Sequence, residues 1–192
     1  MLYAPGTFTG EYVPTRPSLD LADQIQDIDI IMAHEFGLGS DDDPNKGNIE
    51  NARFVLRVLE IRPELPVVGT EAVHRALLAE SDGAVGVPNE HKVIGDSVNA
   101  LGGGLGTWGE LLKLKQVMAA EERLRPLLVA QAYHIGRVAL QATKAGIDDF
   151  VVPTELPRNF VPDSTQRWTR NHYWWSIREL AGVPLLRWQG KI

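Results

Sequence analysis

Short apolar segments alternate with amphipathic segments of helical length along most of this chain. The apolar segments are rich in β-branched residues, whereas the longer segments repeat their apolar residues with a helical period. Strands joined through such helices run parallel, because tight turns connect only antiparallel neighbours. A parallel sheet is covered on both faces. The alternation therefore predicts a three-layer, Rossmann-like α/β fold, in which a mainly parallel sheet has helices on both faces.

The same patterns predict the individual elements. We expect strands at 27–33, 66–70, 92–96, 126–130 and 149–153. We expect helices at 48–61, 71–80, 107–125 and 131–146, and a last, aromatic helix at 164–182. Residues 1–20 are rich in Pro, Gly and Thr and lack periodicity, which indicates an N-terminal arm. Residues 21–192 are then expected to form a single α/β domain that includes the aromatic helix.

Composition excludes several classes of function. The chain has no cysteine, which excludes disulfides, thiol catalysis and cysteine-based zinc sites. Its formal charge of −6 argues against nucleic acid and anionic membrane surfaces as partners. No segment approaches the roughly 18 apolar residues of a membrane span, and no secretory signal pattern opens the chain. We expect a cytoplasmic protein with a small-molecule ligand, and a homo-oligomer is compatible with these features.

Polar side chains follow three of the predicted strands. The segments are AHEFGLGSDDDPNKG after the first strand, DSVNALGGGLGTWGE after the third and QAYHIGR after the fourth. In an open α/β sheet, ligands bind outside the carboxyl ends of the strands, where helix N-termini also present unpaired N–H groups. These three segments are therefore the predicted surroundings of a ligand.

His134 and Arg137 stand three residues apart at the start of the fourth helix, so they share one helix face. An arginine beside free N–H groups can hold a carboxylate or phosphate, and a histidine can bind or transfer a proton. In the structural alternative, His134 packs at the strand end and Arg137 pairs with an acidic neighbour. The sequence leaves both interpretations open.

The segment GLGTWG at 104–109 fits the pattern G-x-G-x-x-G, but it does not predict a dinucleotide site. Such a motif follows the first strand and needs an acidic residue about twenty positions later, where this chain has Val129. Thr107 and Glu110 fit a capping box at the start of the helix, in which each side chain satisfies an exposed N–H group.

The same glycine-rich segment remains a candidate for ligand contact. Gly103, Gly104 and Gly106 would let a ligand approach the backbone closely. Asp96 and Asn99 would donate or accept hydrogen bonds at the edge of that ligand.

The acidic segment after the first strand suggests a metal hypothesis. Carboxylates and a histidine that would serve as hard ligands are present at Glu35, Asp41, Asp42, Asp43 and His34. The segment is not a calcium loop, because the sixth position counted from Asp41 is Lys46 and not glycine. We expect a solvated loop here and no metal site.

The stretch LLVAQAYHIGRVALQATKAGI resembles the bacterial YdcF/SanA/ElyC-like family, which has a strand followed by a His-x-x-Arg helix. The start of the helix at Thr107 and Glu110 is similar to the family's T-x-E-N segment, although Leu111 replaces the asparagine. NIENARFVLRVL and STQRWTRNHYWWSIRELAG also resemble the family's first crossover helix and C-terminal helix. The resemblance covers roughly residues 25–182.

The resemblance implies a Rossmann-like fold whose ligand crevice includes Thr107, Glu110, His134 and Arg137. It also implies a nucleotide-like or adenosyl ligand, with S-adenosylmethionine as the cofactor associated with YdcF. Our leading hypothesis is a small protein that binds an anionic or adenosyl-containing molecule. If the protein also catalyses a transfer reaction, the catalytic candidates are His134, Glu35 and Asp96.

Two other hypotheses belong to different classes of protein. One is a metal-dependent, phosphatase-like hydrolase that uses Glu35 and Asp41 to Asp43. The other is a non-catalytic regulatory or interaction protein that uses the N-terminal arm and the aromatic C-terminal segment as a partner surface. In residues 164–192 of that segment, five basic residues outnumber the single acid Glu179.

Overall fold

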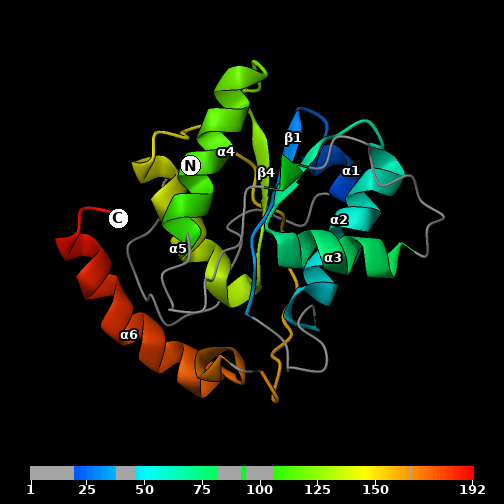
Figure 1. Ribbon diagram of the computed structural model, residues 1–192. Helices are drawn as coiled ribbons and strands as arrows, with labels where there is room; N and C mark the ends of the chain where they lie inside the picture. Colours follow the sequence, from blue (N-terminus) through cyan, green and yellow to red (C-terminus); the bar gives the residue numbers. More distant parts are fainter. Residues whose placement is uncertain (1–19, 38–45, 82–91, 94–105, 165) are drawn as a thin grey trace.

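The computed structural model describes residues 20–37, 46–81, 92–93, 106–164 and 166–192 (Figure 1). The α-helices of this part of the chain are α1 (Leu21–Gln24), α2 (Ile49–Ile61), α3 (Glu71–Glu80), α4 (Gly106–Ala120), α5 (Ala132–Lys144) and α6 (His172–Trp188). Its 3₁₀ helices are η1 (Lys46–Asn48) and η2 (Arg167–Thr169). Its strands are β1 (Ile30–Ala33), β2 (Val67–Gly69), β3 (Lys92–Val93) and β4 (Pro126–Val129).

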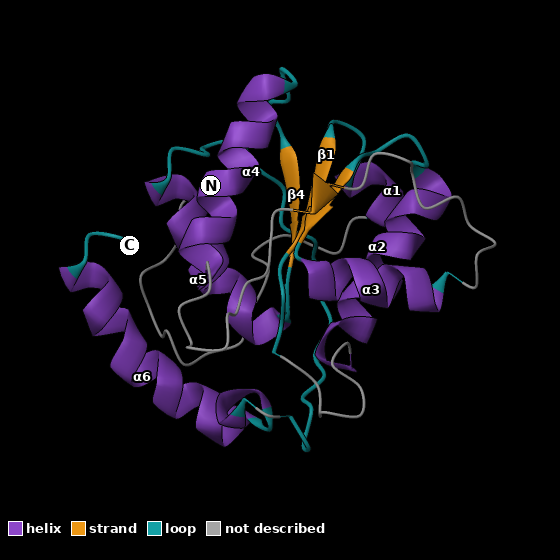
Figure 2. Ribbon diagram, in the orientation of Figure 1, coloured by secondary structure: helices purple, strands orange, loops and turns teal. Residues whose placement is uncertain are grey.

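The strands form one parallel sheet in the order β3-β2-β1-β4. The chain moves outward from β1 to β3 on one side and then crosses to β4 on the other, so the direction of winding reverses between β1 and β4. Figure 2 shows the sheet between α4 and α5 on one side and α1, α2 and α3 on the other. The predicted Rossmann-like α/β fold class is confirmed.

Side-chain alternation along the strands builds a separate core on each face of the sheet. Ile31 and Val129 belong to the core beneath α2 and α3. Met32 and Leu128 belong to the core beneath α4 and α5. All four side chains are fully buried. Burial on both faces explains why these strands are continuous apolar runs and do not alternate with polar residues.

Local signals set the ends of several helices. Thr70 precedes α3, and its hydroxyl accepts the amide proton of Val73, as expected of an N-cap threonine. Helix α2 ends at Ile61, two residues before Pro63, because the residue before a proline avoids helical geometry. The helix predicted at 71–80 is confirmed, because α3 has the same bounds.

Several predicted elements have other bounds in the structure: the helix predicted at 107–125 ends at Ala120, and the strand predicted at 27–33 begins at Ile30. Two differences are larger. The segment 149–153 is not a strand: only Val151 pairs, in an isolated parallel bridge with Leu127 beside β4. The last helix begins at His172 and not at 164, because the Asn171 side chain caps it by accepting from the amide of Trp174. It continues through Pro184 to Trp188.

Other parts of the organisation were not predicted or lie outside the described residues. The one-turn helix α1 begins at Leu21, directly after the segment predicted as an arm, and Asp20 caps it. The arm itself, at 1–19, is outside the described residues. Among the described helices, none combines the length and the apolar character needed to cross a membrane.

Candidate functional site

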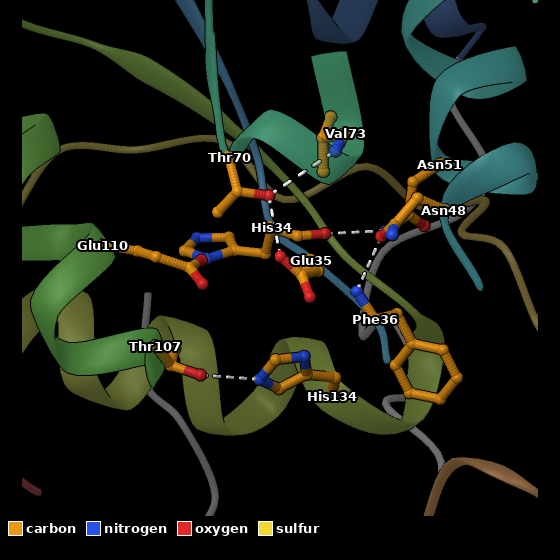
Figure 3. A network of polar contacts seen from close by, with 10 residues as sticks. All are labelled: His34, Glu35, Phe36, Asn48, Asn51, Thr70, Val73, Thr107, Glu110 and His134. Carbon is orange, nitrogen blue, oxygen red and sulfur yellow. Dashed lines mark hydrogen bonds and ion pairs between the residues drawn. The ribbon is translucent and has the colours of Figure 1, made fainter. Parts of the chain in front are cut away.

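A buried polar cluster lies at the carboxyl ends of β1 and β4, the two strands between which the winding of the sheet reverses. His34 directly follows β1, and Gln131 follows β4 and precedes α5. Ligands of open α/β sheets bind at this position, outside the point where the winding reverses. Helix α4 contributes Thr107 and Glu110 to the same place, and α5 contributes His134 (Figure 3).

The first contact of the cluster joins His34 to Glu110. His34 Nδ1 lies 2.7 Å from Glu110 Oε2, and the two side chains are 0% and 4% exposed. The backbone around His34 is fixed as well, because its N–H donates to the carbonyl of Val129 and its carbonyl accepts from Asn51 Nδ2. His34 Nε2 is buried and has no hydrogen-bond partner among the residues described. The ring therefore has one nitrogen anchored and one available.

The second contact joins His134 to Thr107, whose Oγ1 lies 3.0 Å from His134 Nε2. The other ring nitrogen, Nδ1, is buried and unpaired within the described part of the chain. Burial holds the pKa of His134 well below its ordinary value, and the nearby charges of Arg137, His34 and Arg178 act in the same direction. The ring is consequently neutral near pH 7.

These contacts correct the predicted capping box. Thr107 lies inside α4, which begins at Gly106, so it is not the N-cap residue. Thr107 and Glu110 instead bond to His134 and His34. The spacing of three residues therefore places two polar side chains on the face of α4 that meets the strand ends.

Arg137 is the cation of the cluster. Its Nε lies 3.5 Å from Glu179 Oε1 on α6, within ion-pair distance but without hydrogen-bond geometry. Burial lowers the pKa of Arg137, while Glu179 and Glu110 act against that shift. The predicted alternative, in which Arg137 pairs with an acidic neighbour, is confirmed.

A second arginine shares the same acid. Arg178 Nη1 lies 3.3 Å from Glu179 Oε1, the oxygen that also faces Arg137. Burial and the charge of Arg137 lower the pKa of Arg178 to about 10, although Glu179 acts in the opposite direction. Two guanidinium groups thus meet a single carboxylate, which leaves one positive charge on this side of the cluster.

Trp175 attaches α6 to the cluster. It is 4% exposed, and its indole N–H donates to the carbonyl of Tyr133 at 3.0 Å. Its ring centroid lies 5.4 Å from that of His134 and 5.2 Å from that of Phe36, and the Arg137 guanidinium lies 5.7 Å away. Helix α6 is therefore anchored through its first turns over the polar cluster.

Glu35 lies beside the cluster at the end of β1. Its Oε2 accepts a hydrogen bond of 2.9 Å from the hydroxyl of Thr70. In Figure 3 the carboxylate points toward the side on which His134 and Thr107 lie. The predicted residues Glu35, which follows β1, and His134 and Arg137, which lie on α5, come from two segments that the fold brings to the same strand ends.

The remaining predicted site residues are placed differently. Gly106 has a φ of +55° where α4 begins, and a side chain there would meet nothing within 4 Å. The other predicted positions of that loop and of the acidic loop fall outside the described residues; these are Asp96, Asn99, Gly103, Gly104, Asp41, Asp42 and Asp43. Within the described ranges, no group of three or more His, Asp or Glu side chains is arranged to hold a metal ion.

Sequence reasoning did not assign His34, Glu179 and Arg178 to this site. His34 was considered only as a metal ligand, although its position directly after a buried strand is the same signal that identified His134. Glu179 and Arg178 carried no such signal, because nothing in the sequence places α6 against α5.

Comparisons with protein-family models, with curated proteins and with solved structures find no match to the chain. The site is therefore interpreted from its own chemistry. It combines an anchored imidazole, a neutral imidazole and a pair of arginines that share one acid, all at the carboxyl ends of parallel strands. Such a set can bind an anionic group and can exchange a proton with it.

Proposed function

We propose that the protein binds a small molecule with an anionic group at the carboxyl ends of β1 and β4. The observation that carries this proposal is the pair Arg137 and Arg178, which share one carboxylate oxygen of Glu179. Beside them, His134 Nδ1 has no hydrogen-bond partner among the described residues. A buried cation without a full set of partners is costly, and a ligand anion would supply the missing partner.

The start of α5 favours the same group of the ligand. Its N-cap residue, Gln131, makes no side-chain capping bond, and its Oε1 is buried without a partner among the described residues. The positive end of the dipole of this 13-residue helix therefore faces the strand ends, where it stabilises negative charge.

The opposite side of the cluster suits hydroxyl or amino groups of the ligand. Glu35 and Glu110 provide carboxylates there, and His34 Nε2 is available as a donor or acceptor. A molecule with both a negative group and hydroxyl or amino groups would match both sides. S-adenosylmethionine has a carboxylate, an amino group and ribose hydroxyls, so it is the first candidate, as the family resemblance also implies.

Calorimetric titration tests the proposal. Wild type is titrated with S-adenosylmethionine, ATP, NAD and inorganic phosphate, and so is Arg137→Met, which keeps much of the apolar stem but removes the charge. Glu179 keeps Arg178 as a partner in this variant, which limits its structural cost. Loss of one charge-assisted contact weakens binding by about tenfold or more.

Arg75→Met is the matched control, because Arg75 is an exposed helical arginine on α3, with Glu71 at 3.9 Å. We expect wild-type affinity for this variant. Equal affinity of wild type and Arg137→Met for every ligand bound would refute the anion site.

A further inference from the structure

We propose that His34 is the general base of a hydrolytic active site, that Glu110 positions it, and that the substrate class is a phosphate monoester. This inference rests on the proposed anion site, which would hold the phosphoryl group next to the reactive nitrogen. It assigns an activity and two residue roles that anion binding alone does not require.

The geometry of the pair supports this role. A buried carboxylate at 2.7 Å from Nδ1 keeps the proton on that nitrogen, so that Nε2 presents its lone pair. The same carboxylate stabilises the imidazolium that forms when Nε2 takes up a proton. Backbone bonds to Val129 and Asn51 hold His34 on both sides of its Cα, so the ring is preorganised.

His134 is suited to a different task. Its ring is neutral and desolvated, without a carboxylate partner, so it is a poor store for a proton. When the hydroxyl of Thr107 donates to Nε2, the ring proton resides on Nδ1, which then becomes a donor toward the ligand. The centroids of the two imidazole rings are 6.3 Å apart, so a group bound by His134 lies within reach of water held at His34.

The donors on the α5 side favour a phosphoryl group over a carboxylate. Arg137 and His134 Nδ1 lie on α5, and Arg178 on α6 adds a second guanidinium beside Glu179, so the donors come from two helices. A phosphate monoester offers three non-bridging oxygens and up to two negative charges to such donors, whereas a carboxylate offers two oxygens and one charge.

The reaction balances with water as the only co-reactant. His34 Nε2 takes a proton from water while the water oxygen forms a bond to phosphorus and the ester P–O bond breaks. The departing alkoxide, on the opposite side of phosphorus, takes a proton from a second water, and the imidazolium returns its proton to the hydroxide formed, so that only one water is consumed. The products are an alcohol and inorganic phosphate, and His34 and Glu110 regain their initial protonation.

The experiment measures turnover and binding on the same proteins. Hydrolysis of 4-methylumbelliferyl phosphate is followed by fluorescence in the presence of a chelator, and affinity for inorganic phosphate is measured by calorimetry. For His34→Gln we expect kcat to fall by about 10²- to 10⁴-fold while phosphate affinity changes less than about threefold. His74→Gln, on α3, is the control and should keep wild-type turnover.

Glu110→Gln supplies a readout that a purely structural role would not change. Nitrogen-15 NMR of the histidine side chains reports the tautomer, and we expect His34 to be protonated at Nδ1 in wild type. The Glu110→Gln variant should lose this preference and lose turnover together, while the far-UV circular dichroism remains native.

The outcomes separate this inference from the proposed function. If the wild-type protein binds phosphate but does not hydrolyse the ester, the catalytic role is overturned and the anion site stands. The same holds if His34→Gln keeps its turnover. Absence of both phosphate binding and turnover would overturn this inference, and the anion site would fall with it only if no titrated ligand binds more weakly to Arg137→Met than to wild type.

Discussion

The imidazole of His34 and the carboxylate of Glu110 lie 2.7 Å apart in the interior, although 76 residues separate them in the chain. His34 directly follows the central strand β1, and Glu110 lies in the second turn of α4. The contact therefore ties the helix to the sheet at the strand ends. One polar pair contributes to the stability of the fold and to the proposed chemistry.

The first prediction concerns the stability that this pair provides. Glu110→Ala removes one partner and leaves the Nδ1–H donor of His34 buried without an acceptor, so we expect the free energy of unfolding to fall by about 1–3 kcal/mol. Urea denaturation at neutral pH measures the change. Glu50→Ala is the comparison, because the Glu50–Arg53 pair is exposed, and such pairs contribute about 1 kcal/mol or less. Equal losses in the two variants would contradict the assignment.

The second prediction concerns acid sensitivity. Burial holds the pKa of His134 below its unfolded value near 6.5. Above that pH the ring is neutral in both states, so it adds no pH dependence. As the pH falls below it, only the unfolded chain takes up the proton. Wild type then loses up to about 1.4 kcal/mol per pH unit until the folded-state pKa is reached.

Replacing the ring removes this contribution. We expect the unfolding free energy of His134→Gln to depend less on pH than that of wild type between about pH 6.5 and pH 5. Trp188→Ala, at an exposed position without a titratable group, should follow the wild-type slope. Unfolding curves across this pH range test the difference, and parallel slopes for wild type and His134→Gln would rule it out.

The third prediction distinguishes the two ends of α6. Trp175 is 4% exposed, whereas Trp188 is 84% exposed. Trp175→Ala should cost about 3–5 kcal/mol, because it empties a packed position and leaves the carbonyl of Tyr133 without its donor. Trp188→Ala should change stability by about 0.5 kcal/mol or less. Thermal unfolding of both variants shows whether the anchor of α6 lies in its first turns.

The fourth prediction concerns two glycines. A Cβ at Gly47 would lie 2.3 Å from the carbonyl oxygen of Phe36, a backbone atom that cannot move aside cheaply. Gly47→Ala should therefore destabilise the protein by about 1–3 kcal/mol. A Cβ at Gly182, inside α6, would meet nothing within 4 Å, so Gly182→Ala should stabilise by about 0.5–1 kcal/mol. Differential scanning calorimetry distinguishes these opposite signs.

The fold could be predicted because local pattern and tertiary structure agree over the sheet and most helices. In a chain whose short apolar runs alternate with helices, a continuous apolar run such as 126–130 indicates a strand that is buried on both faces of the sheet. The prediction was wrong at 149–153, which also contains a short apolar run but pairs only through Val151 beside β4. It was wrong at the last helix because a single Asn171 cap outweighs the helical spacing upstream.

The site could be predicted in part. The position of His134 and Arg137 after β4 follows from strand order alone, because the carboxyl ends of parallel strands meet at one edge. The partners of these residues follow from contacts between distant segments. Glu179 reaches Arg137 through the packing of Trp175, and Thr107 bonds to His134 and not to its own helix. Residue spacing within α4 predicted the capping box instead.

The most direct test of the central claim is a titration with inorganic phosphate observed by nitrogen-15 NMR of the histidine and arginine side chains. We expect saturable shifts of the His134 ring nitrogens and of Arg137 Nε, with no response from Arg75. In Arg137→Met, the shifts of the His134 ring nitrogens should disappear. Saturable phosphate binding that leaves His134 and Arg137 unshifted would place the anion elsewhere and contradict the account.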